Sequence, residues 1–214
     1  MEKKLYYVLM ADVIDSRKLD QQKLMTEFKN IVRLLNSQQH LNILSPMTIT
    51  LGDEFQGVVN DLQSAINIII ALEEMILSEE LEFKLRYTLI QGQIDTEINN
   101  KIAYEMLGEG LTTARERLQE LKNDKRRFYI GLKDKKLADA INNTFFAFQG
   151  IVDDWTRLND IYIASRFIHN IDYKQIAIEV NKEKSVIWKR KKSLKIEEYL
   201  ALKNVLKYLG GIAI

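Results

Sequence analysis

Residues 4–17 read KLYYVLMADVIDSR, an apolar run that ends in two carboxylates. Apolar character at successive positions is typical of a strand buried on both faces, so we expect a strand over Lys4–Asp12. The run is barely as long as the shortest signal-peptide core, and it enters Asp12 and Asp15 without a small-residue cleavage site. This stretch therefore predicts a buried strand with acidic side chains at its end.

The sequence on either side alternates between helical and strand patterns. Leu24, Phe28, Val32 and Leu35 recur at helical spacing, and Asp61 is a natural N-cap before another apolar run. The expected strands are Lys4–Asp12, Met47–Leu51, Glu54–Asn60, Glu82–Gln91 and Phe128–Gly131. The expected helices among them are Gln21–Gln39, Asp61–Ser78 and Leu111–Lys122.

The resulting order is β-α-β-β-α-β-α-β. Its first six elements predict a ferredoxin-like α+β fold, an antiparallel sheet with helices on one face. We place a domain boundary between Gly131 and Gly150, with one domain over residues 1–133 and an all-α domain over 134–214. The helices expected in the second domain are Asp134–Ala147, Asp154–Asn170, Tyr173–Val180, Ser185–Lys192 and Ile196–Leu209.

Composition excludes several classes of chemistry. The 214 residues include no cysteine and only two histidines, His40 and His169. Disulfide frameworks, cysteine-ligated metals and cysteine nucleophiles are therefore excluded, and any metal would have to be held by oxygen ligands. No apolar stretch approaches the ~20 residues of a membrane span. We expect a soluble, cytoplasmic protein with no membrane partner.

Two acidic segments carry the chemistry expected of the first domain. Strands one and three are neighbours in a ferredoxin-like sheet, so Asp12 and Asp53 should approach each other, with Asp15 and Glu54 nearby. Close carboxylates repel unless a cation neutralises them, and Mg²⁺ or Mn²⁺ bound by Asp12 and Asp53 would do so. The alternative is structural, because an aspartate at a strand end is often a turn or cap residue and Gly52-Asp53 is a common hairpin turn.

A strand that ends in Asp-apolar-apolar, followed by a Gly-Asp hairpin, resembles the catalytic domain of class III nucleotidyl cyclases and of the related GGDEF diguanylate cyclases. This resemblance implies that Asp12 and Asp53 are metal ligands and that the protein is a homodimer. The segment TARERL, residues 113–118, is similar to the cyclase segment Asn-x-Ala-x-Arg-Leu. It implies the catalytic positions, with Arg117 at the transition-state arginine and Thr113 at the ribose-orienting asparagine.

The chain departs from the cyclase pattern at the positions that read the base. Thr113 stands for asparagine, no lysine is present among Thr48–Thr50, and Leu51 stands for the second glycine of the GGDEF hairpin. The metal pair is kept while the base-reading groups are not. This favours nucleotide or metal sensing over cyclase activity.

The segments ADVIDSR, residues 11–17, and LGDEFQG, residues 51–57, together resemble the SatD family of small bacterial proteins. The resemblance runs through most of the chain. It implies a bacterial cytoplasmic protein.

Four further residues are candidates for nucleotide or phosphate binding. Arg17 would contact a phosphate or pair with Asp15. Gly108 and Gly110 precede a predicted helix, whose N-terminus would cradle a phosphate, or they serve the fold alone. Arg115, in the same helix, is the fourth candidate.

A net charge of +1 hides a basic stretch over residues 182–195. The segment YKQIAIEVNKEKSVIWKR, residues 173–190, has helix-turn-helix spacing and is similar to the Ile-Ala-x-x-x-Gly-x-Ser pattern of many bacterial regulators. Ile176, Ala177, Val180 and Ile187 would form the core between the two helices, and Asn181 stands at the turn where glycine is usual.

The second helix of this segment would bind duplex DNA. Lys191 would reach phosphates together with Arg190 and Lys192, which are two of the six predicted DNA-binding residues. Those six residues are Lys184, Ser185, Trp188, Lys189, Arg190 and Lys192. The alternative is a solvated basic helix on a small bundle, or a surface for protein contacts.

The favoured hypothesis is therefore a regulator in which a degenerate cyclase-like domain senses a nucleotide or metal and a helix-turn-helix binds DNA. One alternative is an active metal-dependent nucleotidyl cyclase or phosphotransferase that uses Asp12 and Asp53. The other is a protein-interaction module in which both sites are vestigial.

Overall fold

A computed structural model describes residues 4–212. Five strands form one sheet in the order β2-β3-β1-β4-β5. The apolar run of the opening sequence is β1 (Leu5–Val13), which lies between β3 (Glu54–Val59) and β4 (Leu85–Gln93). The edges are β2 (Ile43–Ile49) and β5 (Phe128–Gly131). The prediction of a buried strand over Lys4–Asp12, with the third strand beside it, is confirmed.

The sheet is mixed, which corrects the predicted antiparallel sheet. β1 pairs antiparallel with β3 and β4, and β2 pairs antiparallel with β3, as a ferredoxin-like order requires. β5 pairs parallel with β4. The helix between these two strands returns the chain to the end of the sheet at which β4 begins, so β5 runs in the same direction as β4.

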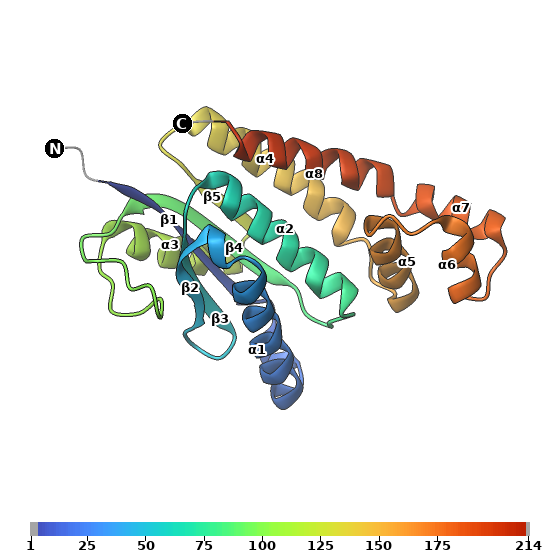
Figure 1. Cartoon of the computed structure of the whole chain (residues 1–214), viewed down its shortest axis with the longest axis horizontal. Coiled ribbons are helices and arrows are strands. Elements are labelled where there is room, and N and C mark those ends of the chain that lie inside the picture. The colour runs from blue at the N-terminus through green and yellow to red at the C-terminus, as the bar shows by residue number, and fades with distance from the viewer. Residues whose placement is uncertain (1–3, 213–214) are drawn as a thin grey trace.

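Helices cover both faces of the sheet, which corrects the prediction of helices on one face (Figure 1). Helix α1 (Gln21–Gln38) and helix α2 (Leu62–Ser78) share a face with Leu9 and Ala11 of β1. Helix α3 (Glu109–Glu120) covers the other face, where it packs on Val8 and Met10. Because alternate residues of a strand point to opposite faces, β1 supplies both hydrophobic layers.

The chain beyond the sheet is helical, as predicted. It forms α4 (Lys135–Val152), α5 (Leu158–Ile168), α6 (Tyr173–Glu179), α7 (Lys184–Ser193) and α8 (Ile196–Gly210). Helix α8 returns to lie along α2 and α4, while α5, α6 and α7 gather at the end away from the sheet (Figure 1).

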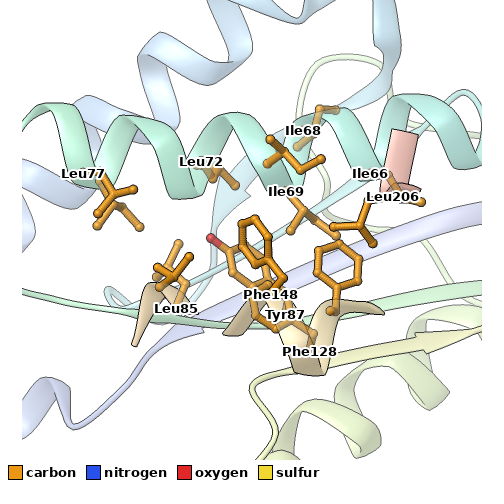
Figure 2. Packing of buried hydrophobic residues seen from close by; sticks show 14 of the residues in the cluster. Ile66, Ile68, Ile69, Leu72, Leu77, Leu85, Tyr87, Phe128, Phe148 and Leu206 are labelled. Carbon is orange, nitrogen blue, oxygen red and sulfur yellow. The ribbon is translucent and has the colours of Figure 1, made fainter. Parts of the chain in front are cut away.

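Aromatic rings join this helical segment to the sheet. Phe128 of β5 stacks on Phe145 of α4, and Phe148 contacts both Phe128 and Tyr199 of α8. Figure 2 shows Phe128, Phe148 and Tyr87 beneath the isoleucines of α2. One cluster of buried side chains runs from β1 to Ile187, and the domain boundary placed between residues 131 and 150 stays a prediction.

Several element bounds differ from the prediction by one to five residues, among them those of the second strand and of α4. The second strand begins at Ile43 rather than Met47, because Pro46 interrupts the pattern yet is accommodated on an edge strand. Helix α4 continues to Val152, five residues beyond the predicted end. Within residues 4–212, no helix is both long and apolar enough to cross a membrane.

Candidate functional site

Asp12 lies in a row of polar residues across three strands. It pairs with Glu54 of β3 and with Arg86 of β4 in the strand register. Directly opposed residues in a sheet point to the same face. That face is the one under α3, because Met10, two residues earlier, packs there. The row Glu54–Asp12–Arg86 therefore lies beneath the C-terminal end of α3.

Asp12 is held by two cations of the chain. Arg86 Nη1 lies 3.0 Å from Oδ1 and 3.0 Å from Oδ2 of Asp12. Lys122, in the turn η3 (Leu121–Asn123) after α3, places Nζ 3.5 Å from Oδ2. The side chain of Asp12 is only 5% exposed. Burial raises the pKa of the Asp12 carboxyl above its usual value, and Arg86 and Lys122 oppose that rise.

The hairpin lies beside the end of β1, as the sequence predicts. The backbone N–H of Val13 donates to the carbonyl oxygen of Asp53 over 2.8 Å. The carboxylate of Asp53 accepts a 2.5 Å hydrogen bond from Ser16 Oγ, in the turn η1 (Ser16–Lys18). Both predicted metal ligands thus lie at the same end of the sheet, and each already has a partner within the chain.

The neighbouring acidic residues are also engaged. Glu54 Oε1 accepts a 3.0 Å hydrogen bond from Thr50 Oγ1 and lies 3.9 Å from Arg115 Nη2. Asp15 has a left-handed backbone, with φ of 55°, and pairs with Lys18 over 2.8 Å. Lys18 lowers the pKa of the Asp15 carboxyl. The predicted phosphate ligand Arg17, in the same turn, is exposed.

This arrangement does not fit a divalent cation at Asp12. Both oxygens of its carboxylate contact Arg86, and a metal ion on either oxygen would face that guanidinium directly. No three acidic or histidine side chains of residues 4–212 group into a set that could hold a metal ion. Mg²⁺ or Mn²⁺ binding by Asp12 and Asp53 stays a prediction.

Thr113 and Arg117 line a separate cavity of about 320 Å³. They share a face of α3, and the cavity also includes Lys133 and Lys135 beyond β5. Arg117 lies 5.2 Å over the ring of Tyr129 and forms a 2.5 Å ion pair with Glu120. The cavity reaches Leu5, at the opposite end of β1 from Asp12. Neither predicted metal ligand is among the described residues that line it.

Gly108 and Gly110 allow α3 to approach β4 closely. A Cβ atom on Gly108, whose φ is 157°, would lie 2.4 Å from the carbonyl oxygen of Gln93. A Cβ atom on Gly92 would lie 2.4 Å from the Cα of Gly110. Real Cβ atoms do not come as close as 2.4 Å, so the packing of helix on strand requires glycine at positions 92 and 108, and a Cβ on Gly110 would lie a tight 3.0 Å from Gly92. The alternative interpretation of the two glycines, as residues of the fold, therefore has a direct physical basis.

Arg115 faces away from that cavity. Its Nη2 lies 3.4 Å from Oε1 of the buried Gln56. Together with Met10, Tyr104 and Met106, Arg115 lines a second cavity of about 490 Å³ beneath the loop that precedes α3. The four phosphate candidates are thus spread over three places, with Gly110 alone in the cavity of Arg117.

The predicted helix-turn-helix segment forms two packed helices, α6 and α7. Asn181 has φ of 50°, the left-handed conformation that its position at the turn implies. Ile176, Ala177 and Ile187 are buried between the helices and the rest of the bundle.

The basic side chains of α7 divide into two sets. Arg190 forms an ion pair with Asp160 of α5, and Lys191 lies 3.0 Å from Glu197 of α8. The remaining DNA-binding candidates, by contrast, are exposed to solvent. They are Lys184, Ser185, Trp188, Lys189 and Lys192.

Arg86 and Lys122, the partners of Asp12, were not among the residues predicted for the site. Arg86 occupies a polar position in the alternating pattern of its strand, which on its own indicates only a side chain on the second face. The signal that identifies it is the register of β4 against β1, which opposes Arg86 to Asp12. Lys122 carries no local signal, because its contact depends on where α3 ends.

The fold and the polar row define a mixed α+β protein in which a ferredoxin-like sheet carries an internally ion-paired acidic site. The model of the SatD family matches residues 6–209, so the chain belongs to the SatD family. This confirms the resemblance seen in the two acidic segments. No curated protein matches the chain.

The solved structures similar to this chain include nucleotide cyclases. A bacterial light-regulated adenylyl cyclase matches with 15% identity and a TM-score of 0.46, over 61% of this chain and 77% of that chain. The catalytic core of a rhodopsin-guanylyl cyclase with converted specificity, in complex with ATPαS, matches with 16% identity and a TM-score of 0.45, over 61% and 78%. The guanylyl cyclase domain of the RhoGC fusion protein from the aquatic fungus Blastocladiella emersonii matches with 16% identity and a TM-score of 0.44. The match covers 61% of this chain and 82% of that chain.

Proposed function

We propose that this protein is a DNA-binding regulator in which α6 and α7 act as a helix-turn-helix and the sheet domain is a non-catalytic sensor. The observation that carries the proposal is the exposed face of α7. Ser185, Trp188, Lys189 and Lys192 are exposed, while Ile187 is buried on the opposite side. Positions 185, 189 and 192 follow helical spacing and therefore share one face.

The length and positive charge of this face support the proposal of binding to duplex DNA. Ten residues of α-helix extend about 15 Å, and the major groove, about 12 Å wide, admits such a helix. Lysines on the outer face would contact phosphates, and Trp188, which is 60% exposed, offers an apolar surface to base edges. Arg190 and Lys191 would serve the bundle instead, through Asp160 and Glu197.

The test compares the exposed pair Lys189 and Lys192 with Lys191 of the same helix, which is ion-paired to Glu197. Lys189→Ala/Lys192→Ala should weaken binding to a random-sequence duplex about tenfold or more and flatten its dependence on salt, because two phosphate contacts are lost. Lys191→Ala is the matched control and should bind as the wild type does. Fluorescence anisotropy over a series of salt concentrations measures both. Equal affinity of all three proteins would contradict the proposal, as would salt-independent binding.

The cavity of Thr113 and Arg117 is the site we propose for the sensed ligand. Arg117, Lys133 and Lys135 contribute three positive charges, against Glu109 in the lining and Glu120 paired with Arg117, and the remaining excess suits a phosphorylated small molecule such as a nucleotide. A thermal-shift screen with ATP, GTP and cyclic nucleotides tests this, because a ligand of the folded state raises Tm. Arg117→Ala/Lys133→Ala should abolish the shift. A shift that survives in this variant would place the ligand elsewhere.

We further propose that the protein acts as a homodimer. Two recognition helices about 34 Å apart would fit successive turns of one face of the duplex, and ligand binding would alter that spacing. Light scattering after gel filtration tests the dimer directly. A monomer at all concentrations would contradict it without affecting the DNA-binding test on α7.

A further inference from the structure

The ion pairs around Asp12 answer a physical requirement of a buried carboxylate. A carboxylate that is removed from water is strongly destabilised unless positive charge and hydrogen-bond donors replace its hydration. Asp12 is 5% exposed and is therefore in this situation. In a metal site the positive charge comes from the ion, whereas here it comes from protein side chains next to the oxygens.

Arg86 supplies most of this replacement. Its Nη1 contacts both oxygens of Asp12 at 3.0 Å, and its own side chain is 13% exposed. A guanidinium has a high pKa and stays charged throughout the range in which proteins fold. The neutralisation of Asp12 is therefore permanent and depends on no ion from solution.

The surroundings of the row add further positive charge. Lys122 lies 3.5 Å from Asp12, and Arg115 lies 3.9 Å from Glu54. Three cations thus face the two carboxylates of the row. The remaining candidate ligand, Asp53, accepts a hydrogen bond from Ser16 at 2.5 Å. A divalent cation entering this site would have to displace Arg86 and overcome the repulsion of Lys122.

We propose that Arg86, assisted by Lys122, takes the place of a divalent cation at Asp12, so that the acidic site of this protein is neutralised by its own side chains and works without metal. The guanidinium joins the inner strands β1 and β4 where β1 ends, and Lys122 ties the end of α3 to the same carboxylate. The site is then a fixed structural clamp under α3 and not a place where an ion binds and leaves.

The first experiment measures Mn²⁺ binding to the full chain by the loss of the free-ion EPR signal. The wild type should leave the signal unchanged up to millimolar Mn²⁺, and its Tm should be the same in Mn²⁺ and in EDTA. Mn²⁺ binding by the wild type that Asp12→Asn abolishes would overturn the proposal. Binding that Asp12→Asn leaves intact lies at another site, so it supports a metal-free Asp12.

The second experiment tests whether Arg86 is the neutralising group. Arg86→Met should lower Tm by about 5 °C, because it leaves a buried carboxylate without its main counter-charge. Adding Asp12→Asn should restore most of that loss. Lys84→Met is the control, because Lys84 lies two residues before Arg86, just ahead of β4, but pairs with Asp153, and Asp12→Asn should not rescue it.

The outcomes separate clearly. A double variant Arg86→Met/Asp12→Asn that is less stable than Arg86→Met alone would overturn the proposal. If Arg86→Met does not fold, a double variant that does fold supports the proposal, and one that also fails overturns it. DNA binding by α7 is not part of either readout, so this proposal and the proposed function can fail independently.

Discussion

Two arginine–carboxylate pairs lie on opposite faces of the same sheet. Arg127 meets Glu73 on the face under α2, with Nη1 to Oε1 at 2.9 Å and Nη2 to Oε2 at 2.6 Å. Arg86 meets Asp12 on the face under α3 through Nη1 alone. Both side chains of the first pair are 4% exposed, whereas Arg86 is 13% exposed.

The Arg127–Glu73 and Arg86–Asp12 pairs differ more in their hydrogen-bond partners than in their burial. Tyr87 donates its hydroxyl to Glu73 over 2.8 Å, and Arg127 also donates to the Leu85 carbonyl and to Asp153. Burial lowers the pKa of Arg127, but the Glu73 and Asp153 carboxylates outweigh this effect and leave it raised. This network is complete, and it joins α2 to β4 and to the start of β5.

The Asp12 pair, by contrast, is completed by Lys122, which is 42% exposed and belongs to a turn. The difference indicates that the Arg127–Glu73 pair belongs to the packed core, whereas the Arg86–Asp12 pair has fewer partners and lies closer to solvent. A fully satisfied fork in the core contributes to a unique packing, whereas a single guanidinium nitrogen at the end of a strand replaces an ion.

The largest effect is expected for Arg127→Met. Removing one partner leaves Glu73 buried and uncompensated, which costs about 3–5 kcal/mol and lowers Tm by about 10 °C. Urea denaturation measures the loss. The control is Arg127→Met/Glu73→Leu, in which no charge is left alone, so its loss should be smaller. An equal or larger loss in the double variant would show that packing, and not charge, explains the effect.

The second effect concerns Arg86→Met, which should cost about 2 kcal/mol near neutral pH, since Asp12 retains Lys122. Burial raises the pKa of Asp12, so the folded state holds a proton more tightly than the unfolded chain does. The stability that this adds is fully present below the unfolded pKa and is lost as pH rises through the folded pKa. Removing Arg86 raises the folded pKa further.

The loss caused by Arg86→Met should therefore be largest near neutral pH and shrink as acid protonates Asp12. Urea denaturation of wild type and variant at about pH 7 and about pH 5 measures this change. The same comparison against a background of Asp12→Asn should show no such change. A loss that grows in acid would mean that Arg86 stabilises some other group.

Much of the fold could be predicted because its elements follow from hydrophobic periodicity within short segments of the sequence. The apolar run of β1 and the helical spacing of α1 each depend on residues close in sequence, and Asp61 caps α2 by accepting from the Ser64 N–H over 2.7 Å. The approach of Asp53 to the end of β1 followed from strand order alone. These features need no knowledge of how distant segments are aligned.

The occupants of the site could not be predicted in the same way. Arg86 and Asp12 are 74 residues apart in sequence, and their contact depends on the register between β4 and β1. A shift of this register by one residue would turn Arg86 to the other face of the sheet. Arg190 is similar, since a basic side chain in a basic stretch gives no sign that Asp160 of another helix holds it. The parallel direction of β5 likewise depends on where α3 delivers the chain.

The smallest effect is expected for Lys122→Met. An ammonium that is 42% exposed and 3.5 Å from Asp12 is screened by water and salt, so its removal should cost about 0.5 kcal/mol or less. This loss should fade in high salt, whereas the loss from Arg86→Met should persist, because Arg86 is largely shielded from solvent. Urea denaturation at low and at high sodium chloride measures both variants. A Lys122→Met loss as large as that of Arg86→Met would mean that the two cations neutralise Asp12 equally. Arg86 would then not be the main partner of Asp12, as Arg127 is of Glu73 in the core.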